Sequence, residues 1–286
     1  MDETTFRAFN TTLTGPLSVR IQAAVFHLKR EESMTVKTSL EETLLQLMRV
    51  EKAQTSSDAS RHYYIDLHKD RFADILRVCR SYVANPAARV LDVGRSELTA
   101  CLLKFYSNVT TIGLDLGTDD GGHREATSIV EIPHISFDLL NSHRLDRWPE
   151  CGAFDLIVFS EVLEHLSIAP EFVLAFLNSL LADSGVLVCT TPNASDIAKR
   201  IRLACGRNPF ERLRLYSTNP GHIREYTRRE LCHIAHSVGL KCVRHSYFDW
   251  PHSVDRSWVK SACMRLVRLY PPFRGSSVTI FRREVS

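Results

Sequence analysis

Short apolar runs alternate with amphipathic segments along the chain from residue 89 onward. Apolar runs closed by glycine or polar residues predict buried strands, which we expect at 89–93, 109–115, 134–139, 154–160, 186–190, 241–247 and 277–282. Helical spacing of apolar residues predicts helices at 98–105, at 171–181 and, after a capping box at 227–230, up to Gly239. Because strands and helices alternate, the pattern predicts an α/β fold with a doubly wound, mostly parallel, seven-stranded sheet covered on both faces.

The first part of the chain carries a weaker pattern than the rest. A capping box at 39–42 precedes leucines at helical spacing, and the polar stretch 54–60 is typical of a linker. We therefore expect an N-terminal helical extension, partly flexible, over 1–60, and a main domain over 61–286 that opens with a helix at 63–84. Three roles are open for the extension: dimerisation, docking of a partner, and covering of the site.

Composition narrows the class of protein. Hydrophobic residues make up 44% of the 286 residues and charged residues 24%, which is typical of a globular protein. The net charge of +3 is too small to indicate a nucleic-acid partner without a concentrated basic face. The eight cysteines are scattered singly, so we expect reduced thiols in the cytoplasm. No apolar run reaches the ~20 residues that span a bilayer, and the opening MDETTFRAFN does not resemble a secretory signal.

Polar residues stand where the predicted strands end. Asp92 and Gly94 close the first strand, and Asp115 closes the second. Asp138 follows the third, and Glu161 follows the fourth. Ligands of open parallel sheets bind beyond the carboxyl ends of the strands, so these residues mark the expected site. A carboxylate such as Asp115 can accept hydrogen bonds from two ribose hydroxyls, and a glycine lets a ligand approach the backbone.

These motifs together resemble the class I S-adenosylmethionine-dependent methyltransferases. The matching segments are VLDVG (90–94), GLD (113–115), FDLL (137–140) and FDLIVFSEVLEHL (154–166). The last of these is similar to the branch that contains quinone, polyketide and sugar methyltransferases. The resemblance covers about residues 62–285, and it implies S-adenosyl-L-methionine as the cofactor.

The resemblance also implies roles for the residues of the first two strand ends. Gly94 would lie under the methionine part of the cofactor, and Asp92 would help to orient that part through the loop or a water molecule. Asp115 would hold the ribose diol.

The next two strand ends receive roles from the same resemblance. Asp138 would accept a hydrogen bond from the adenine amine, and Leu139 would lie beside the ring. Ser160 and Glu161 would border the methionine end and the position of methyl transfer. Glu161 and Glu164 could instead be charges at the first turn of a helix.

One segment departs from the family pattern. The family usually continues as G-x-G-x-G, whereas this chain has Ser96 and Leu98 after Gly94. A lost glycine costs backbone freedom and close approach. The departure keeps open a catalytically silent binding or scaffold protein. The segment also fails the G-x-G-x-x-G pattern of nicotinamide-binding enzymes.

Two histidines are candidate catalytic bases. His165 follows the fourth strand, and His222 lies in an H-x-x-E-Y-T segment whose counterparts in the family often face the substrate, as Tyr226 would. A general base must come within ~3 Å of the proton that it takes; otherwise either histidine merely packs its loop. His68 and Arg71 belong either to a helix that closes over the cofactor or to a solvated face.

We expect no metal centre. The histidines near the site do not show ligand spacing combined with a carboxylate partner.

A basic insertion at about 195–222 follows the fifth strand, where family members place a substrate lid, and Arg207 within it would face the substrate. The insertion interleaves arginines with apolar residues. Lid, peripheral membrane contact and solvated helix are the competing interpretations. An amphipathic helix expected at about 254–270 also suits either core packing or a membrane surface.

The function expected from these features is methyl transfer to a hydroxyl group of a small molecule, such as a sugar, glycolipid or polyketide-like product. Two alternatives remain. One is the silent scaffold, and the other is an RNA methyltransferase. The second would need a continuous basic surface and an N-P-P-[YF] motif, where this chain reads Ser160-Glu161-Val162-Leu163.

Overall fold

The computed structural model describes residues 58–114, 132–214, 221–250, 267 and 269–284. These residues lie in a compact unit that spans Ser57–Ser286. The predicted helix near residues 40–48, most of the amphipathic helix expected at 254–270, and Asp115 lie outside the described residues. No helix of the described part is long and apolar enough to cross a bilayer.

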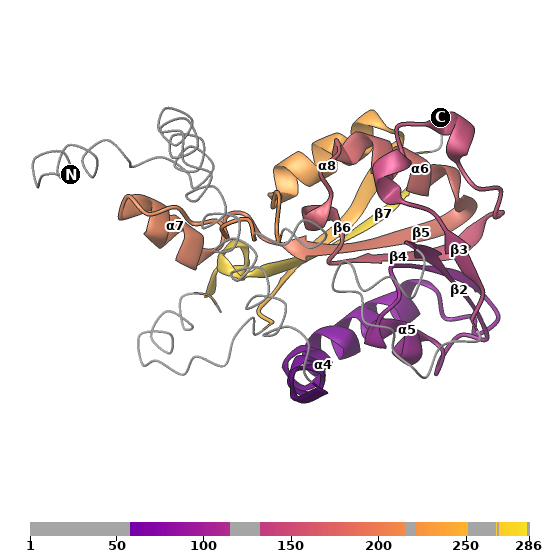
Figure 1. Ribbon diagram of the computed structural model, residues 1–286, viewed down its shortest axis with the longest axis horizontal. Coiled ribbons are helices and arrows are strands. Elements are labelled where there is room, and N and C mark those ends of the chain that lie inside the picture. The colour runs from indigo at the N-terminus through magenta and orange to yellow at the C-terminus, as the bar shows by residue number, and fades with distance from the viewer. Residues whose placement is uncertain (1–57, 115–131, 215–220, 251–266, 268, 285–286) are drawn as a thin grey trace, which may run out of the picture. The chain divides into compact units, whose positions relative to one another are not determined.

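The described strands form one seven-stranded sheet in the order β3-β2-β1-β4-β5-β7-β6, which confirms the predicted fold (Figure 1). The strands are β1 (Arg89–Val93), β2 (Asn108–Gly113), β3 (His134–Ser136), β4 (Phe154–Ser160), β5 (Leu181–Pro192), β6 (Leu240–Phe248) and β7 (Ser276–Arg283). All neighbours are parallel except β7, which is antiparallel to both β5 and β6. The direction of strand order reverses between β1 and β4, so a ligand site is expected beyond their carboxyl ends.

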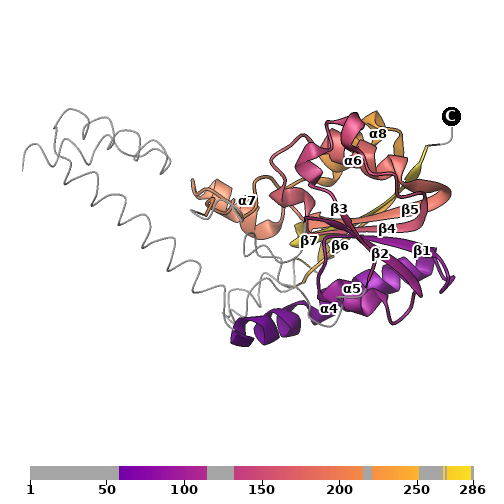
Figure 2. The ribbon, with the colours of Figure 1, turned by 45° about the vertical axis from the view of Figure 1, so that its right-hand side comes forward.

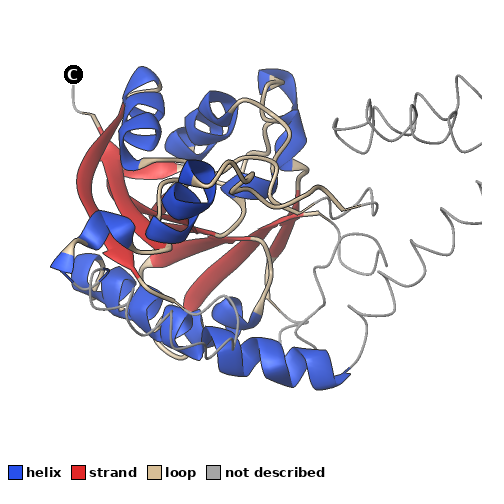
Figure 3. Ribbon diagram, turned by 90° about the vertical axis from the view of Figure 1, so that its left-hand side faces the viewer, coloured by secondary structure: helices blue, strands red, loops and turns tan. Residues whose placement is uncertain are grey.

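Helices cover both faces of the sheet (Figures 2 and 3). The described α-helices are α4 (Asp58–Tyr82), α5 (Glu97–Leu102), α6 (Pro170–Ser179), α7 (Ile197–Ala204) and α8 (Arg228–Ser237). Helices α4 and α5 lie on one face, α6 and α8 lie on the other, and α7 lies beyond the end of the sheet. Short 3-10 helices follow β3 (η2, Leu139–Asn141) and β4 (η4, Leu163–His165).

The core has two layers because the side chains of β4 alternate between the faces. Leu156 and Val158 are fully buried in the cluster that includes residues of α4 and α5. Ile157 and Phe159 are fully buried in the cluster that includes residues of α6 and α8. Each such side chain contributes about 1.5–3 kcal/mol when it leaves water. This alternation holds β4 rigidly and so fixes the turn that follows it.

Several element ends differ from the sequence expectation; β3 ends at Ser136 rather than at residue 139, and α5 ends at Leu102 rather than at residue 105. Helix α4 begins at Asp58, so the polar stretch expected to be a linker is helical at its end. Strand β5 begins at Leu181 rather than at residue 186, with an irregular register against β4. The expected capping box of α8 is present, since the Thr227 hydroxyl accepts from the amide of Glu230 while the Glu230 carboxylate accepts from the amide of Thr227.

Candidate active site

Two glycines bring the backbones of β1 and β2 close together at their carboxyl ends. Gly94 has a φ of +86°, a left-handed conformation that favours glycine. A Cβ atom added to Gly113 would lie 3.8 Å from the Gly94 Cα atom. The amide of Gly94 donates to the carbonyl oxygen of Ile112 at 2.8 Å, which fixes this approach. The pair forms the kind of side-chain-free surface that a cofactor needs against the backbone.

The residues that replace the later glycines of the family pattern have structural roles. Ser96 begins α5, since its hydroxyl accepts from the amide of Leu98, and Thr99 completes a capping box with it. Leu98 is 2% exposed and lies in the α4–α5 core cluster. The bulky side chain therefore points into the core, and the serine satisfies the first turn of the helix.

Asp92 is buried behind this turn. Its carboxylate accepts a hydrogen bond from the Thr99 hydroxyl at 2.6 Å. Desolvation raises the pKa of Asp92 to about 7, although the Thr99 hydrogen bond opposes that shift. The structure thus places Asp92 where it holds the first turn of α5, one step behind the Gly94 loop.

Asp138 and Leu139 follow β3 as the sequence places them. The Asp138 carboxylate caps η2 by accepting from the amide of Leu140 at 2.9 Å. Leu139 is 6% exposed and belongs to the core cluster beneath α6. A cap of this kind fixes the direction of the carboxylate.

The turn after β4 has unusual backbone geometry. Glu161 has a φ of +54°, which is rare for a residue with a side chain and costs about 1–3 kcal/mol. Two contacts hold it there: its Oε1 accepts from Thr190 Oγ1 at 2.8 Å, and its Oε2 lies 3.5 Å from Arg71 Nη1. Ser160 joins the same group through a 3.0 Å hydrogen bond with Thr190. Strand β5, through Thr190, and helix α4, through Arg71, therefore stabilise the strained turn.

Helix α4 contributes buried polar residues to this end of the sheet. His68 is 9% exposed and Arg71 is 6% exposed, and Arg71 pairs with Glu161. The sequence alone left a solvated helix face open for these two residues. Their burial excludes that interpretation.

Glu164 is a functional candidate that the sequence analysis did not single out. Its side chain is fully buried, and Oε2 accepts from Thr191 Oγ1 at 3.3 Å. Desolvation, and secondarily the nearby Glu161 charge, raise its pKa well above the usual range of a carboxyl group. The carbonyl oxygen of Glu164 accepts from the amides of Ile223 and Arg224, which ties η4 to the loop that carries His222.

The two candidate histidines lie side by side. Their ring centroids are 4.9 Å apart, and His165 Nδ1 donates to the Gly221 carbonyl oxygen at 3.0 Å. Desolvation lowers the pKa of His165, which favours the neutral ring. One ligand atom from each of Glu164, His165 and His222 lies within 4.8 Å of the other two. Sequence spacing argued against a metal, but the fold brings these side chains together.

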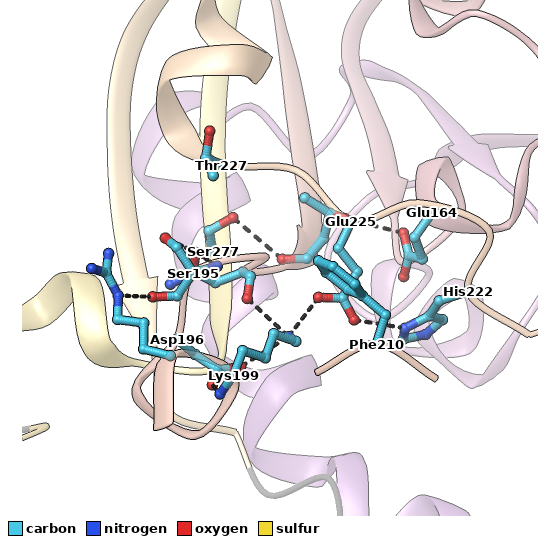
Figure 4. Close-up of polar contacts among 12 residues, drawn as sticks. Glu164, Ser195, Asp196, Lys199, Phe210, His222, Glu225, Thr227 and Ser277 are labelled. Carbon is cyan, nitrogen blue, oxygen red and sulfur yellow. Dashed lines mark hydrogen bonds and ion pairs between the residues drawn. The ribbon is translucent and has the colours of Figure 1, made fainter. Parts of the chain in front are cut away.

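A second set of charges lies behind His222 (Figure 4). His222 Nδ1 donates to Glu225 Oε1 at 3.2 Å, and Glu225 Oε2 pairs with Lys199 Nζ at 2.5 Å. Lys199 also pairs with Asp196 at 2.8 Å and donates to the Asn193 carbonyl oxygen at 2.9 Å. Although burial raises the pKa of Glu225, His222 and Lys199 together lower it. Glu225 is therefore a carboxylate that orients His222.

Tyr226 packs behind the loop that carries His222. Its side chain is 3% exposed and belongs to the core cluster beneath α6, and its expected role on the substrate side stays a prediction. Its backbone bridges Asn193. Tyr226 therefore anchors the loop from behind, because the apolar ring is held inside the core.

The insertion after β5 forms α7 and an extended segment beside two hollows. One, of about 610 Å³, is lined by Lys199, Leu203, Arg207 and Phe210 among others. The second, of about 480 Å³, is lined by Phe210, His222 and Glu225 among others. Arg207 therefore lies beside a cavity, but on the α7 side rather than next to His165. The second hollow is the one that reaches His222.

Comparison with known proteins gives the family. A family model described as a methyltransferase domain matches residues 66–245. A search of curated proteins found no match.

Solved structures share the fold at low identity. The N-methyltransferase NodS from Bradyrhizobium japonicum WM9, in complex with S-adenosyl-L-homocysteine, is 15% identical, with a TM-score of 0.51 over 83% of this chain and 98% of that chain. The 1,6-didemethyltoxoflavin-N1-methyltransferase of Burkholderia thailandensis, bound to its named substrate and S-adenosylhomocysteine, is 16% identical, with a TM-score of 0.50 over 79% and 87%. With the matched domain and the strand order, these findings show that the chain belongs to the class I S-adenosylmethionine-dependent methyltransferases.

Proposed function

We propose that this methyltransferase acts on a hydroxyl group of a small molecule, of the sugar, glycolipid or polyketide-like class. The observation that carries the proposal is the cluster of Glu164, His165 and His222 beyond the carboxyl end of β4. A hydroxyl group must lose a proton as its oxygen takes the methyl group, so an acceptor of this kind needs a proton acceptor beside it.

The cofactor would lie across the ends of β1 to β4. Gly94 and Gly113 leave the backbone open there, and Asp92 holds the loop from behind. Asp115 would hold the ribose, and Asp138 with Leu139 would hold the adenine. Ser160 and Glu161 would border the methionine end. When bound, S-adenosylmethionine supplies an electrophilic methyl group.

The chain's own residues would orient the acceptor and remove its proton. The Gly221 carbonyl oxygen accepts a hydrogen bond from the protonated Nδ1 of His165, which leaves Nε2 as the basic nitrogen. His222 is held in the same way by Glu225 and is the second candidate base. A positioned base contributes about 10²–10⁴-fold to such a step, and orientation contributes several kcal/mol more.

The segment after β5 would cover the acceptor. It presents positive groups such as Lys199 and Arg207 next to the apolar Leu203 and Phe210. This combination suits an acceptor with anionic or sugar groups and an apolar part. These residues support the role of the segment as a lid.

We also propose a cytoplasmic location with peripheral contact to the inner face of the membrane. The cysteines of the described residues are all free thiols, as expected in a reducing compartment. Exposed apolar residues of the insertion, such as Ile201, Leu203 and Leu213, lie among arginines. Such a surface suits an anionic lipid headgroup region.

Two measurements test the proposed function. Calorimetry with S-adenosylhomocysteine should show weaker binding by Asp115→Ala than by the wild type, with exposed Asp146→Ala as the matched control. Equal affinities would remove the ribose assignment. For the acceptor, paired compounds that differ only by a hydroxyl, an amine or a methyl ether should give S-adenosylhomocysteine from the hydroxyl member. Methylation only of the amine members would overturn the choice of oxygen.

A further inference from the structure

Glu164, His165 and His222 form a compact group of potential metal ligands. One ligand atom from each lies within 4.8 Å of the others, and Glu164 Oε1 lies 4.0 Å from His165 Nε2. Ligand atoms around a tetrahedral Zn²⁺ are separated by roughly 3.4 Å, given Zn–N distances near 2.1 Å. The group needs a contraction of up to about 1.4 Å to reach that geometry. A movement of His222 can supply this contraction, because its side chain is 27% exposed and lies in a loop.

The outer contacts of both histidines match those of metal-bound imidazoles. His165 donates through Nδ1 to a backbone carbonyl oxygen, and His222 donates through Nδ1 to the Glu225 carboxylate. Metal-binding histidines usually make such a bond with the ring nitrogen that does not bind the ion. In both rings Nε2 is then the nitrogen that remains for an ion. Lys199 in turn fixes Glu225, so the orientation of His222 is set by two successive contacts.

Glu164 supplies a second and independent indication. Its side chain is fully buried, and Oε1 has no hydrogen-bond partner among the described residues. A buried carboxylate oxygen without a partner is costly, by about 1–3 kcal/mol or more for a charged group. That oxygen is the one nearest to His165 Nε2. The unpartnered atom therefore faces the position that an ion would occupy.

The nearby charges are mixed. Glu161 is the other carboxylate of this turn, and Arg71 is paired with it. The charge of Arg71 also acts on Glu164, and that of Arg214 acts on His165. The ligand atoms, and not the net charge, therefore indicate an ion. Two imidazole nitrogens and one carboxylate favour first-row ions, whereas Mg²⁺ and Ca²⁺ prefer sites built from oxygen alone.

We propose that Glu164, His165 and His222 bind a divalent first-row transition-metal ion, of which Zn²⁺ is the best fit. Catalytic zinc sites commonly use three protein ligands and keep one position open for water or substrate. The ion site stands without the proposed acceptor, but its consequence for the reaction rests on the proposed function. With an ion bound, Glu164 and the two imidazoles would hold it, and it would supply Lewis-acid chemistry that lets the acceptor hydroxyl release its proton to solvent water rather than to an imidazole.

The test is a Co²⁺ titration of the full chain after treatment with a chelator, in the absence of cofactor and acceptor. We expect one equivalent to bind and to produce visible d–d absorption of a four- or five-coordinate ion. Zn²⁺ should displace it, and Mg²⁺ should not. His222→Ala and Glu164→Gln should each weaken Co²⁺ binding by at least about 100-fold, since loss of even an outer contact weakens metal sites 10–100-fold.

His143→Ala is the matched control, because His143 is an exposed histidine elsewhere in the fold and should leave binding unchanged. Thermal melts show which variants fold. If Glu164→Gln does not fold, the Co²⁺ affinity of His222→Ala decides the test. Unchanged Co²⁺ affinity in folded His222→Ala would overturn the proposal. So would a thiolate-to-cobalt charge-transfer band, which would assign binding to cysteines. Because no methyl transfer is measured, failure of the ion site and failure of the proposed reaction are separate results.

Discussion

The carboxyl ends of β1 and β4 each have a buried carboxyl group beside them, but the two groups differ in their contacts. At the end of β1, Asp92 is held by the Thr99 hydroxyl, and the chain continues into a regular capped helix. After β4, Glu164 keeps one oxygen without a hydrogen-bond partner, and the backbone of Glu161 is left-handed. A satisfied buried acid supports the loop around it. Glu164 Oε1 has no such partner in the described part of the chain and lies beside His165, which is why we propose Glu164 as a ligand of an ion.

The contrast between the ends of β1 and β4 predicts that His165, on the β4 side, takes part in the reaction. His165→Gln should lower the rate constant of methyl transfer by about 10²–10⁴-fold, whether the ring takes a proton or holds an ion. Affinity for S-adenosylhomocysteine should change little, because His165 is not among the residues proposed to hold the cofactor. Rate and affinity are measured separately by stopped assays and calorimetry. A parallel loss of both would place His165 on the cofactor side.

The next effect is the pH dependence of stability that Asp92 produces. Its pKa is about 7 in the folded chain, above the value of about 3.9 for an unfolded aspartate. The folded state then binds more protons, so Asp92 costs stability progressively as pH rises from about 4 to 7. Asp92→Asn should remove this cost, and its free energy of unfolding relative to wild type should rise by up to about 4 kcal/mol across that range.

Urea unfolding at several pH values gives the measurement. A difference between the two proteins that stays constant from pH 4 to pH 8 would contradict the raised pKa of Asp92.

A smaller effect is expected at Gly94. Gly94→Ala places a side chain at a φ of +86°, which costs about 1–2 kcal/mol, and it narrows the open backbone at the cofactor position. Cofactor affinity should fall roughly tenfold, equivalent to about 1.4 kcal/mol. Gly206 is the matched control because its φ is +68° and a Cβ there meets open space. Gly206→Ala should lose stability only, and equal losses of affinity would show that strain alone was measured.

The smallest expected effect concerns the charges behind His222. Lys199→Met removes the partner of Glu225 and loosens the orientation of His222. We expect a decrease in the methyl-transfer rate of a few fold, about 1 kcal/mol, as for loss of one hydrogen bond to a charged group. Arg200→Met, one position along α7, is the control. A loss as large as that of His165→Gln would mean that Lys199 touches the reacting groups.

Local patterns predicted most of the fold because they depend on neighbouring residues. The apolar period of 154–160 matches β4, and Thr227 with Glu230 caps α8 as expected. The start of β5 was missed, because Asp183 and Ser184 interrupt the apolar run although pairing with β4 begins at Leu181. Strand pairing there overrides the local pattern.

The site was predictable only in part, because its contacts join distant segments. His165 and His222 were both identified, but their proximity depends on the Glu164 carbonyl oxygen accepting the amides of Ile223 and Arg224. No spacing rule contains that information. The burial of Tyr226 was not predictable for the same reason, since it is decided by the core beneath α6.

The ion pair between Arg71 and Glu161 has a consequence for the first described helix. It attaches α4 to the turn that follows β4, so the orientation of that helix is energetically coupled to the conformation of the turn. Any molecule that recruits the Glu161 carboxylate weakens the attachment of α4, and a displaced α4 changes the affinity for that molecule by the same factor. Ligand binding at Glu161 and attachment of α4 therefore affect each other by the same factor.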